Sequence, residues 1–255
     1  MPRYFLEVSY RGDGLSGFQI QDNAPTVQSA VESAFLIYFR KQVSLTGSSR
    51  TDAGVHAYQN FFHFDWEGEW DQARMYNLNA MLPDNISIRS VRAVRSDAHA
   101  RFDALSRAYE YVVYRRKDPF LKDYGWHFPY EMEKSLLDKL ADYIQLQTHF
   151  EAFSKRNTQV SHYSCQIKES RWHREGDVWT YRVEGNRFLR GMVRALVSTM
   201  LQVARGNKTE EYFYRLFRQD HVGQADFSAP PQGLFLRKVV YPDQIFIDPA
   251  SAKNA

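Results

Sequence analysis

Strand-like and helix-like patterns alternate along this chain, and their order constrains the fold more than any other feature of the sequence. Apolar residues alternate with polar ones across residues 4–10, which predicts a strand. Thr26 precedes apolar residues at helical spacing over 27–39, which predicts a capped helix. Further patterns predict strands at 43–46, 59–64 and 85–94 and a helix at 71–80. The resulting order, β-α-β-β-α-β, is that of a ferredoxin-like unit.

The second half repeats this theme loosely. Its patterns predict strands at 109–114, 165–173, 179–184 and 234–241 and helices at 131–147, 188–204 and 208–217. We therefore expect an α+β fold made of two ferredoxin-like or RRM-like halves with mainly antiparallel sheets. We expect domains at 1–104 and 105–245, followed by a tail at 246–255.

Composition excludes several classes of protein. The single cysteine, Cys165, cannot form an intrachain disulfide, and a zinc site built on several thiolates is excluded with it, so we expect no metal. Residues 1–5 run directly into a strand pattern without the apolar run of a signal peptide, and no stretch approaches the length of a membrane span. We therefore expect a cytoplasmic protein with no membrane partner.

Positive charge gathers in two stretches of the chain. The net charge is only +3, yet residues 89–117 and 182–218 each hold eight Lys or Arg and three Asp or Glu. Such stretches on an otherwise acidic chain are typical of a surface that binds phosphates, although two solvated faces would give the same pattern. The 16 tyrosines and five tryptophans suit either a core or platforms for unstacked bases.

Three glycines, Gly12, Gly14 and Gly17, predict a flexible loop after the first strand. Their G-x-G-x-x-G spacing matches a dinucleotide-binding fingerprint, but residues 18–25 intervene before the next helix opens. That fingerprint needs the helix to start at the third glycine, so dinucleotide binding is excluded.

A loop of small residues between two predicted strands carries the most reactive pattern in the chain. In Arg50-Thr51-Asp52-Ala53-Gly54-Val55-His56, a carboxylate stands two residues from a guanidinium that can hold it ionised. Asp52 is therefore a candidate nucleophile or base. The alternative is ordinary turn chemistry, in which Asp52 bonds local backbone amides.

The helix predicted at 188–204 is apolar at nearly every position except its arginines. Arg187, Arg190 and Arg194 follow at spacings of three and four, which places them on one face of a helix. An arginine among buried positions needs an anionic partner, which for Arg194 is either a structural carboxylate or a catalytic one.

Taken together, these stretches resemble the tRNA pseudouridine synthase A family. The matching residues are Tyr10-x-Gly12, Gly17-Phe18-Gln19-x-Gln21, Thr26-Val27-Gln28, Arg50 to His56, Asn79-x-x-Leu82-Pro83, His99-Ala100-Arg101-Phe102, Tyr109-x-Tyr111, Asn186-x-Phe188-Leu189, Met192-Val193-Arg194 and Gly233-Leu234. Arg11, Phe18, Ser49 and Arg190-Gly191 depart from the usual family pattern, which leaves the chemical core intact.

The resemblance implies roles for individual residues around a central basic cleft. Asp52 matches the catalytic aspartate, and Arg194 matches the basic residue that pairs with it. Arg50 matches an arginine that engages the RNA and helps extrude the target, and Tyr109 matches the tyrosine that stacks on the target base. Leu234 or its neighbour Leu236 can supply part of the apolar wall, or can serve as core residues of the last strand.

The same resemblance implies a pseudouridine synthase fold and the isomerisation of uridine to pseudouridine at positions 38, 39 and 40 of the tRNA anticodon stem-loop. It implies no cofactor and a homodimer that holds tRNA across both subunits. A zinc-dependent base deaminase is excluded by the single cysteine. A glycoside hydrolase would need a second carboxylate, which only folding could bring near Asp52. A non-catalytic structured-RNA-binding protein of the same fold remains the alternative.

Overall fold

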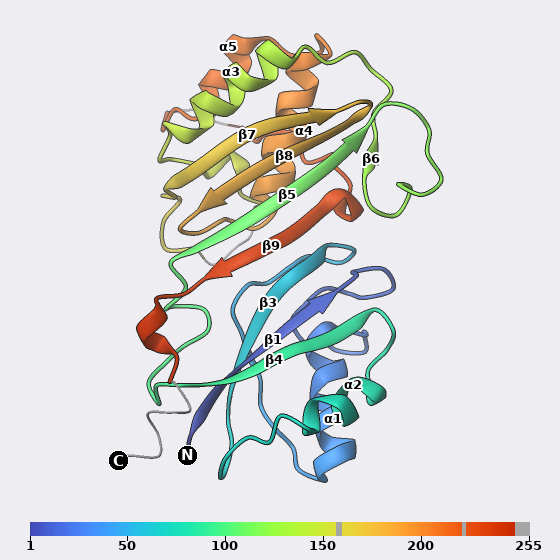
Figure 1. Cartoon of the computed structure of the whole chain (residues 1–255). Coiled ribbons are helices and arrows are strands. Elements are labelled where there is room, and N and C mark those ends of the chain that lie inside the picture. The colour runs from blue at the N-terminus through green and yellow to red at the C-terminus, as the bar shows by residue number, and fades with distance from the viewer. Residues whose placement is uncertain (157–159, 221–222, 248–255) are drawn as a thin grey trace. The chain divides into compact units, whose positions relative to one another are not determined.

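The computed structural model describes residues 1–156, 160–220 and 223–247, and the chain divides into two compact units (Figure 1). Unit 1 comprises Met1–Leu105 together with the segment from Leu236 onward, and unit 2 comprises Ser106–Phe235. In this division most of the last strand belongs to unit 1, whereas the expected domains, 1–104 and 105–245, put that strand in the second domain. The pattern of a strand in the sequence does not show which other strand it will pair with. Residues 248–255 of the expected tail lie outside the described residues.

Unit 1 is an antiparallel sheet with two helices. Its elements are β1 (Arg3–Tyr10), α1 (Val27–Phe39), β2 (Thr46–Gly47), β3 (His56–Asp65), α2 (Arg74–Met81) and β4 (Ile86–Val94). Strand β1 lies between β4 and β3 and is antiparallel to both, and β2 pairs with β3. Helix α1 contacts α2, which packs against β4 (Figure 1). Residues 236–240 of β9 (Leu234–Val240) join this unit, where the Val239 amide donates to Gln59 Oε1 of β3 at 3.1 Å.

The sequence determines helix α1 locally. Thr26 Oγ1 accepts a hydrogen bond from the Ser29 amide at 3.1 Å, and Ser29 Oγ accepts one from the Thr26 amide at 3.0 Å, which forms a capping box. Val27, Val31 and Phe35 recur at intervals of four and are fully buried. One apolar face thus fixes the helix on the sheet.

Unit 2 has the same kind of architecture. Its elements are β5 (Ser106–Tyr114), β6 (Trp126–His127), α3 (Lys134–Gln145), a short 3-10 helix (Glu151–Phe153), β7 (Ile167–Glu175), β8 (Val178–Gly185), α4 (Met192–Ala204), α5 (Glu210–Arg215) and a second 3-10 helix (Pro231–Gly233). Strand β8 lies between β5 and β7 and is antiparallel to both, whereas β6 pairs with β5 in parallel. Helix α3 packs on β7, and α4 contacts β5, α3 and α5 (Figure 1). The predicted α+β class with mainly antiparallel sheets is confirmed.

One predicted helix begins later than its apolar pattern suggests. The pattern predicted a helix from residue 188, but Gly191 takes a positive φ of 76° and α4 begins at Met192. Arg187 and Arg190 therefore precede the helix, and the prediction that they share a helical face with Arg194 is wrong. A left-handed glycine interrupts helical geometry whatever the hydrophobicity of the residues around it.

Among the described residues, no helix is long and apolar enough to cross a membrane.

Candidate active site

In unit 1, two loops approach so closely that only glycine fits between them. A Cβ on Gly12 would lie 2.4 Å from the Val55 carbonyl oxygen and 2.6 Å from the Gly54 carbonyl carbon. Gly17 has a φ of +99°, and a Cβ there would lie 2.8 Å from the Thr51 carbonyl oxygen. The loop predicted to be flexible is therefore packed against the 51–55 backbone, and its glycines serve close approach.

Hydrogen bonds complete the support of the loop that carries Asp52. The Phe18 amide donates to the Thr51 carbonyl at 3.1 Å, and the Tyr10 hydroxyl lies 2.8 Å from Thr51 Oγ1. Asn60, fully buried on β3, donates from Nδ2 to the Ser49 carbonyl at 2.9 Å and to the Tyr10 hydroxyl at 3.1 Å. Buried polar groups with several partners hold one geometry, so this loop is preorganised.

The same network accounts for two departures from the family pattern. Phe18 is buried and stacks on Phe62 with ring centroids 4.4 Å apart, in a space that a Cβ on Gly47 would fill. Ser49 is buried, and its hydroxyl lies 3.1 Å from that of Ser48. Both residues lie beneath the loop, so they support it without displaying new chemistry.

Asp52 itself is half-buried at the start of a turn. The Val55 amide donates to the Asp52 carbonyl at 3.2 Å, and Gly54 takes a φ of +77° in between. Arg50 is exposed, whereas Thr51 between them is buried. Alternate residues thus point toward solvent and toward the supporting network, and the two charged side chains lie on the accessible side of a rigid loop.

Residues that are far apart in the sequence of unit 2 meet around Arg194. This half-buried residue lies in the first turn of α4, and its Nε donates to the Ala229 carbonyl at 2.7 Å. The Tyr111 hydroxyl donates to the next carbonyl, that of Pro230, at 2.7 Å. A Cβ on Gly233 would lie 2.7 Å from the Tyr111 ring, so the 229–233 segment lies directly on that ring. These contacts fix the segment that leads into Leu234.

The environment of Tyr111 keeps its hydroxyl a neutral donor. The ring is fully buried, and burial raises the pKa of this phenol well above its usual value of 10, while the positive charge of Arg194 opposes that shift. A neutral phenol can donate to a carbonyl throughout the ordinary pH range. Ionisation of the phenol therefore does not remove the bond to Pro230 in that range.

Tyr109 lies two residues before Tyr111 on β5, in register with Val183 of β8. Its ring is half-buried and meets Phe188 edge to face, with the ring centroids 5.1 Å apart. Leu234, at the start of β9, is 7% exposed. An aromatic ring held by an edge-to-face neighbour retains its orientation, which suits a stacking platform.

The structure thus places Arg50 and Asp52 together on one loop of unit 1, and it places Tyr109, Arg194 and Leu234 in unit 2. The sequence analysis missed Asn60 and Tyr111 as supporting residues. Tyr111 carries a signal in its i, i+2 spacing from Tyr109, which predicts the same face of one strand. Asn60 carries none, because nothing local shows which backbone carbonyl a strand amide will reach.

Comparisons with known proteins identify relatives over nearly the whole chain. A family model described as tRNA pseudouridine synthase matches residues 147–242. The chain is 39% identical to tRNA pseudouridine synthase A of Parabacteroides distasonis, covering 96% of this chain and 98% of that protein. It is 39% identical to the protein of that name from Bacteroides thetaiotaomicron, covering 96% of this chain and 93% of that protein. It is 36% identical to tRNA pseudouridine synthase A of Porphyromonas gingivalis, covering 97% of this chain and 100% of that protein.

Proposed function

This chain belongs to the tRNA pseudouridine synthase family, and we propose that it isomerises uridine to pseudouridine at positions 38, 39 and 40 of the tRNA anticodon stem-loop. In this reaction the bond between uracil N1 and ribose C1′ breaks, and a bond between uracil C5 and C1′ forms. The hydrogen on C5 leaves as a proton, and N1 gains one. Because atoms and electrons balance within the substrate, the chain's own side chains suffice as acids, bases and supports.

Asp52 is the proposed catalytic carboxylate. Attack on C1′, attack on uracil C6 and deprotonation of C2′ each start from an ionised carboxylate held against the nucleoside. The observation that supports this assignment most directly is the fixed loop, in which Gly12, Gly17 and Asn60 hold the backbone while Asp52 lies on its accessible side. A positioned carboxylate is needed because a small misplacement lowers the rate strongly.

Arg194 is proposed to pair with Asp52 in the assembled site, which would keep the carboxylate ionised. The bond from its Nε to the Ala229 carbonyl supports this role, because it fixes the plane of the guanidinium. Tyr109 would stack on the flipped uracil and keep it oriented while it turns, and Leu234 would contribute to an apolar wall. Arg50, exposed beside Asp52, would engage the RNA backbone.

The substrate defines the proposed partner and place of action. Two stretches with a local excess of arginine and lysine suit the phosphates of an anticodon arm held in a basic cleft. We place the enzyme in the cytoplasm as a homodimer that holds one tRNA across both subunits.

Release of tritium from tRNA labelled at uracil C5 tests the proposal, because pseudouridine formation must expel that hydrogen. We expect wild-type protein to release it and Asp52→Asn to abolish release while tRNA binding survives. Retained turnover in Asp52→Asn would refute the assignment of the carboxylate. Wild-type protein that binds tRNA without any release would instead indicate a non-catalytic RNA-binding protein.

Tyr109→Ala tests the stacking role separately. We expect kcat to fall more than tRNA affinity, because the ring acts on a base that is already extruded. A loss that tracks affinity alone, at every salt concentration, would make Tyr109 a binding residue only.

A further inference from the structure

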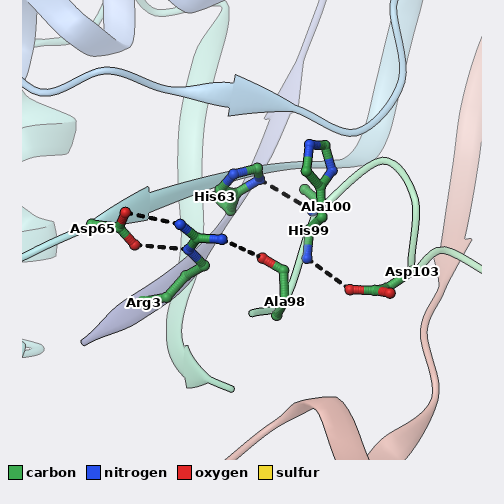
Figure 2. A network of polar contacts seen from close by, with 7 residues as sticks. All are labelled: Arg3, His63, Asp65, Ala98, His99, Ala100 and Asp103. Atoms are coloured by element: carbon green, nitrogen blue, oxygen red, sulfur yellow. Dashed lines mark hydrogen bonds and ion pairs between the residues drawn. The ribbon is translucent and has the colours of Figure 1, made fainter. Parts of the chain in front are cut away.

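A second rigid loop in unit 1, residues 98–103 between β4 and β5, is not used by the proposed mechanism. Figure 2 shows its backbone bound from several sides. Arg3 Nη1 donates to the Ala98 carbonyl at 3.0 Å, while the same guanidinium forms two bonds to Asp65 at 2.7 and 2.9 Å. The Ala100 amide donates to His63 Nδ1 at 3.1 Å. A loop held by buried and charged partners keeps one conformation.

Two further bonds close the loop. The Asp103 carboxylate accepts from the His99 amide at 2.7 Å, and the Tyr241 hydroxyl donates to the Ala100 carbonyl. Ala98 and Ala100 are fully buried, so the loop is fixed from beneath. The two residues between Ala100 and Asp103 remain exposed.

His63 is suited to its place under the loop only as a neutral ring. It is 8% exposed, and its Nδ1 must carry a lone pair to accept the Ala100 amide. Burial, followed by the nearby His99 and Arg3, lowers the pKa of His63 from 6.5 to about 4, although Asp65 and Asp103 act in the opposite direction. The anchor is therefore intact at neutral pH.

The outward side chains of this loop form a basic and aromatic tip, which we define as Arg101 and Phe102. Phe102 is 73% exposed, and Arg101 is exposed with its guanidinium carbon 5.6 Å from the centre of the Phe102 ring. The His99 ring lies 4.2 Å from the Phe102 ring, centroid to centroid, and supports it from one side. A large aromatic ring is thus held in water beside a cation.

A rigid exposed ring beside a cation matches the chemistry of a single-stranded nucleotide. Nucleobases stack on aromatic side chains irrespective of their identity, and a neighbouring arginine meets the phosphate. Preorganisation increases the affinity because little side-chain or loop freedom is lost on binding. The position of the tip within the basic stretch 89–117 favours an anionic partner over the apolar surface of a second copy.

We propose that the Arg101–Phe102 tip contacts the tRNA substrate, with Phe102 stacked on an unpaired nucleobase and Arg101 on an adjacent phosphate. This contact rests on the proposed function in requiring tRNA as the substrate, and it adds a recognition residue pair that is separate from Asp52 and its loop.

The test measures the Kd of wild-type protein and variants for a labelled tRNA transcript by fluorescence anisotropy at several salt concentrations. We expect Phe102→Ala to weaken binding about 10-fold and Phe102→Trp to restore it, because tryptophan retains a stacking face. We expect Arg101→Gln to reduce the magnitude of the slope of log K against log salt concentration by about one, because one phosphate contact is lost. Phe102→Ala should keep the wild-type salt dependence.

A matched control is Tyr76→Ala, which removes an aromatic ring that is 81% exposed on α2 of the same unit. It should leave the Kd unchanged. A wild-type Kd for tRNA in Phe102→Ala would overturn the proposal. The proposal would also fail if Phe102→Ala changed only the self-association of the protein, measured by sedimentation velocity, and left the Kd for tRNA unchanged. Because binding is measured without turnover, failure of wild-type protein to release tritium would refute the proposed function while this contact is judged on affinity alone.

Discussion

Replacing Gly12 with alanine tests whether the close approach of two backbones positions Asp52. The new Cβ would lie 2.4 Å from the Val55 carbonyl oxygen and 2.7 Å from the Val55 amide nitrogen. Both atoms belong to the backbone, so no side chain can rotate away. Gly12 is also anchored, since its amide donates to His56 Nδ1 at 3.0 Å.

The size of the effect follows from this geometry. Restoring an ordinary contact between carbon and oxygen requires the two loops to separate by roughly 1 Å, and such overpacking costs about 1–3 kcal/mol of stability. A displacement of about 1 Å at a catalytic group lowers rates on the order of 100-fold, or ~2.7 kcal/mol in the activation free energy. We therefore expect the rate to fall far more than the fraction of folded protein.

Tritium release under single-turnover conditions measures the rate, and urea denaturation measures the stability. Gly14→Ala is the matched control, because Gly14 has a φ of +73° with no atom within 4 Å of its added Cβ. The control should lose about 1 kcal/mol of stability to backbone strain yet keep the wild-type rate. If Gly12→Ala turns over like Gly14→Ala, the close approach does not position Asp52, and that reasoning is refuted.

Two further predictions concern the supports of the loops. Tyr111→Phe leaves the part-buried Pro230 carbonyl without its donor, so we expect about 0.5–1.5 kcal/mol lower stability in urea, and unchanged stability would show that the bond contributes nothing. Because the pKa of His63 is lowered to about 4 in the folded protein, the unfolded chain binds a proton first as the pH falls below 6.5. The contribution of His63 to folding stability should therefore be constant well above pH 6.5 and fall by about 1–3 kcal/mol toward pH 4. His63→Gln retains an acceptor for the Ala100 amide and should remove that part of the pH dependence; an identical pH profile in this variant would contradict the assignment.

Local patterns predicted most of the fold because each helix and strand buries one periodic face. The strand at 85–94 and the helix at 27–39 were predicted nearly to the residue, since alternation and helical spacing are properties of the sequence itself. The boundary of α4 was missed by four residues, because the dihedral angles of Gly191 decide it rather than hydrophobicity. The predicted strand at 43–46 reduced to Thr46–Gly47, because pairing with β3 sets its length.

The candidate site was predictable as chemistry and not as geometry. Asp52 and Arg50 are visible in the sequence because charged residues stand out among small ones. Their support is not visible, since Gly12, Gly17 and Asn60 act through the backbone of segments up to about 40 residues away. Sequence spacing carries no information on which backbone a glycine will approach, so only the folded chain reveals that these loops form one unit.

Buried tyrosines hold loops in place in both units. The hydroxyl of Tyr10 bonds Thr51, that of Tyr111 bonds Pro230, and that of Tyr241 bonds Ala100. All three rings are buried, so each side chain contributes apolar packing at one end and a directed hydrogen bond at the other. A phenylalanine would supply the packing but release the loop. These three tyrosines therefore show a third use of aromatic residues, beside a core and a nucleobase platform, in which the ring belongs to the core and the hydroxyl sets the position of a loop.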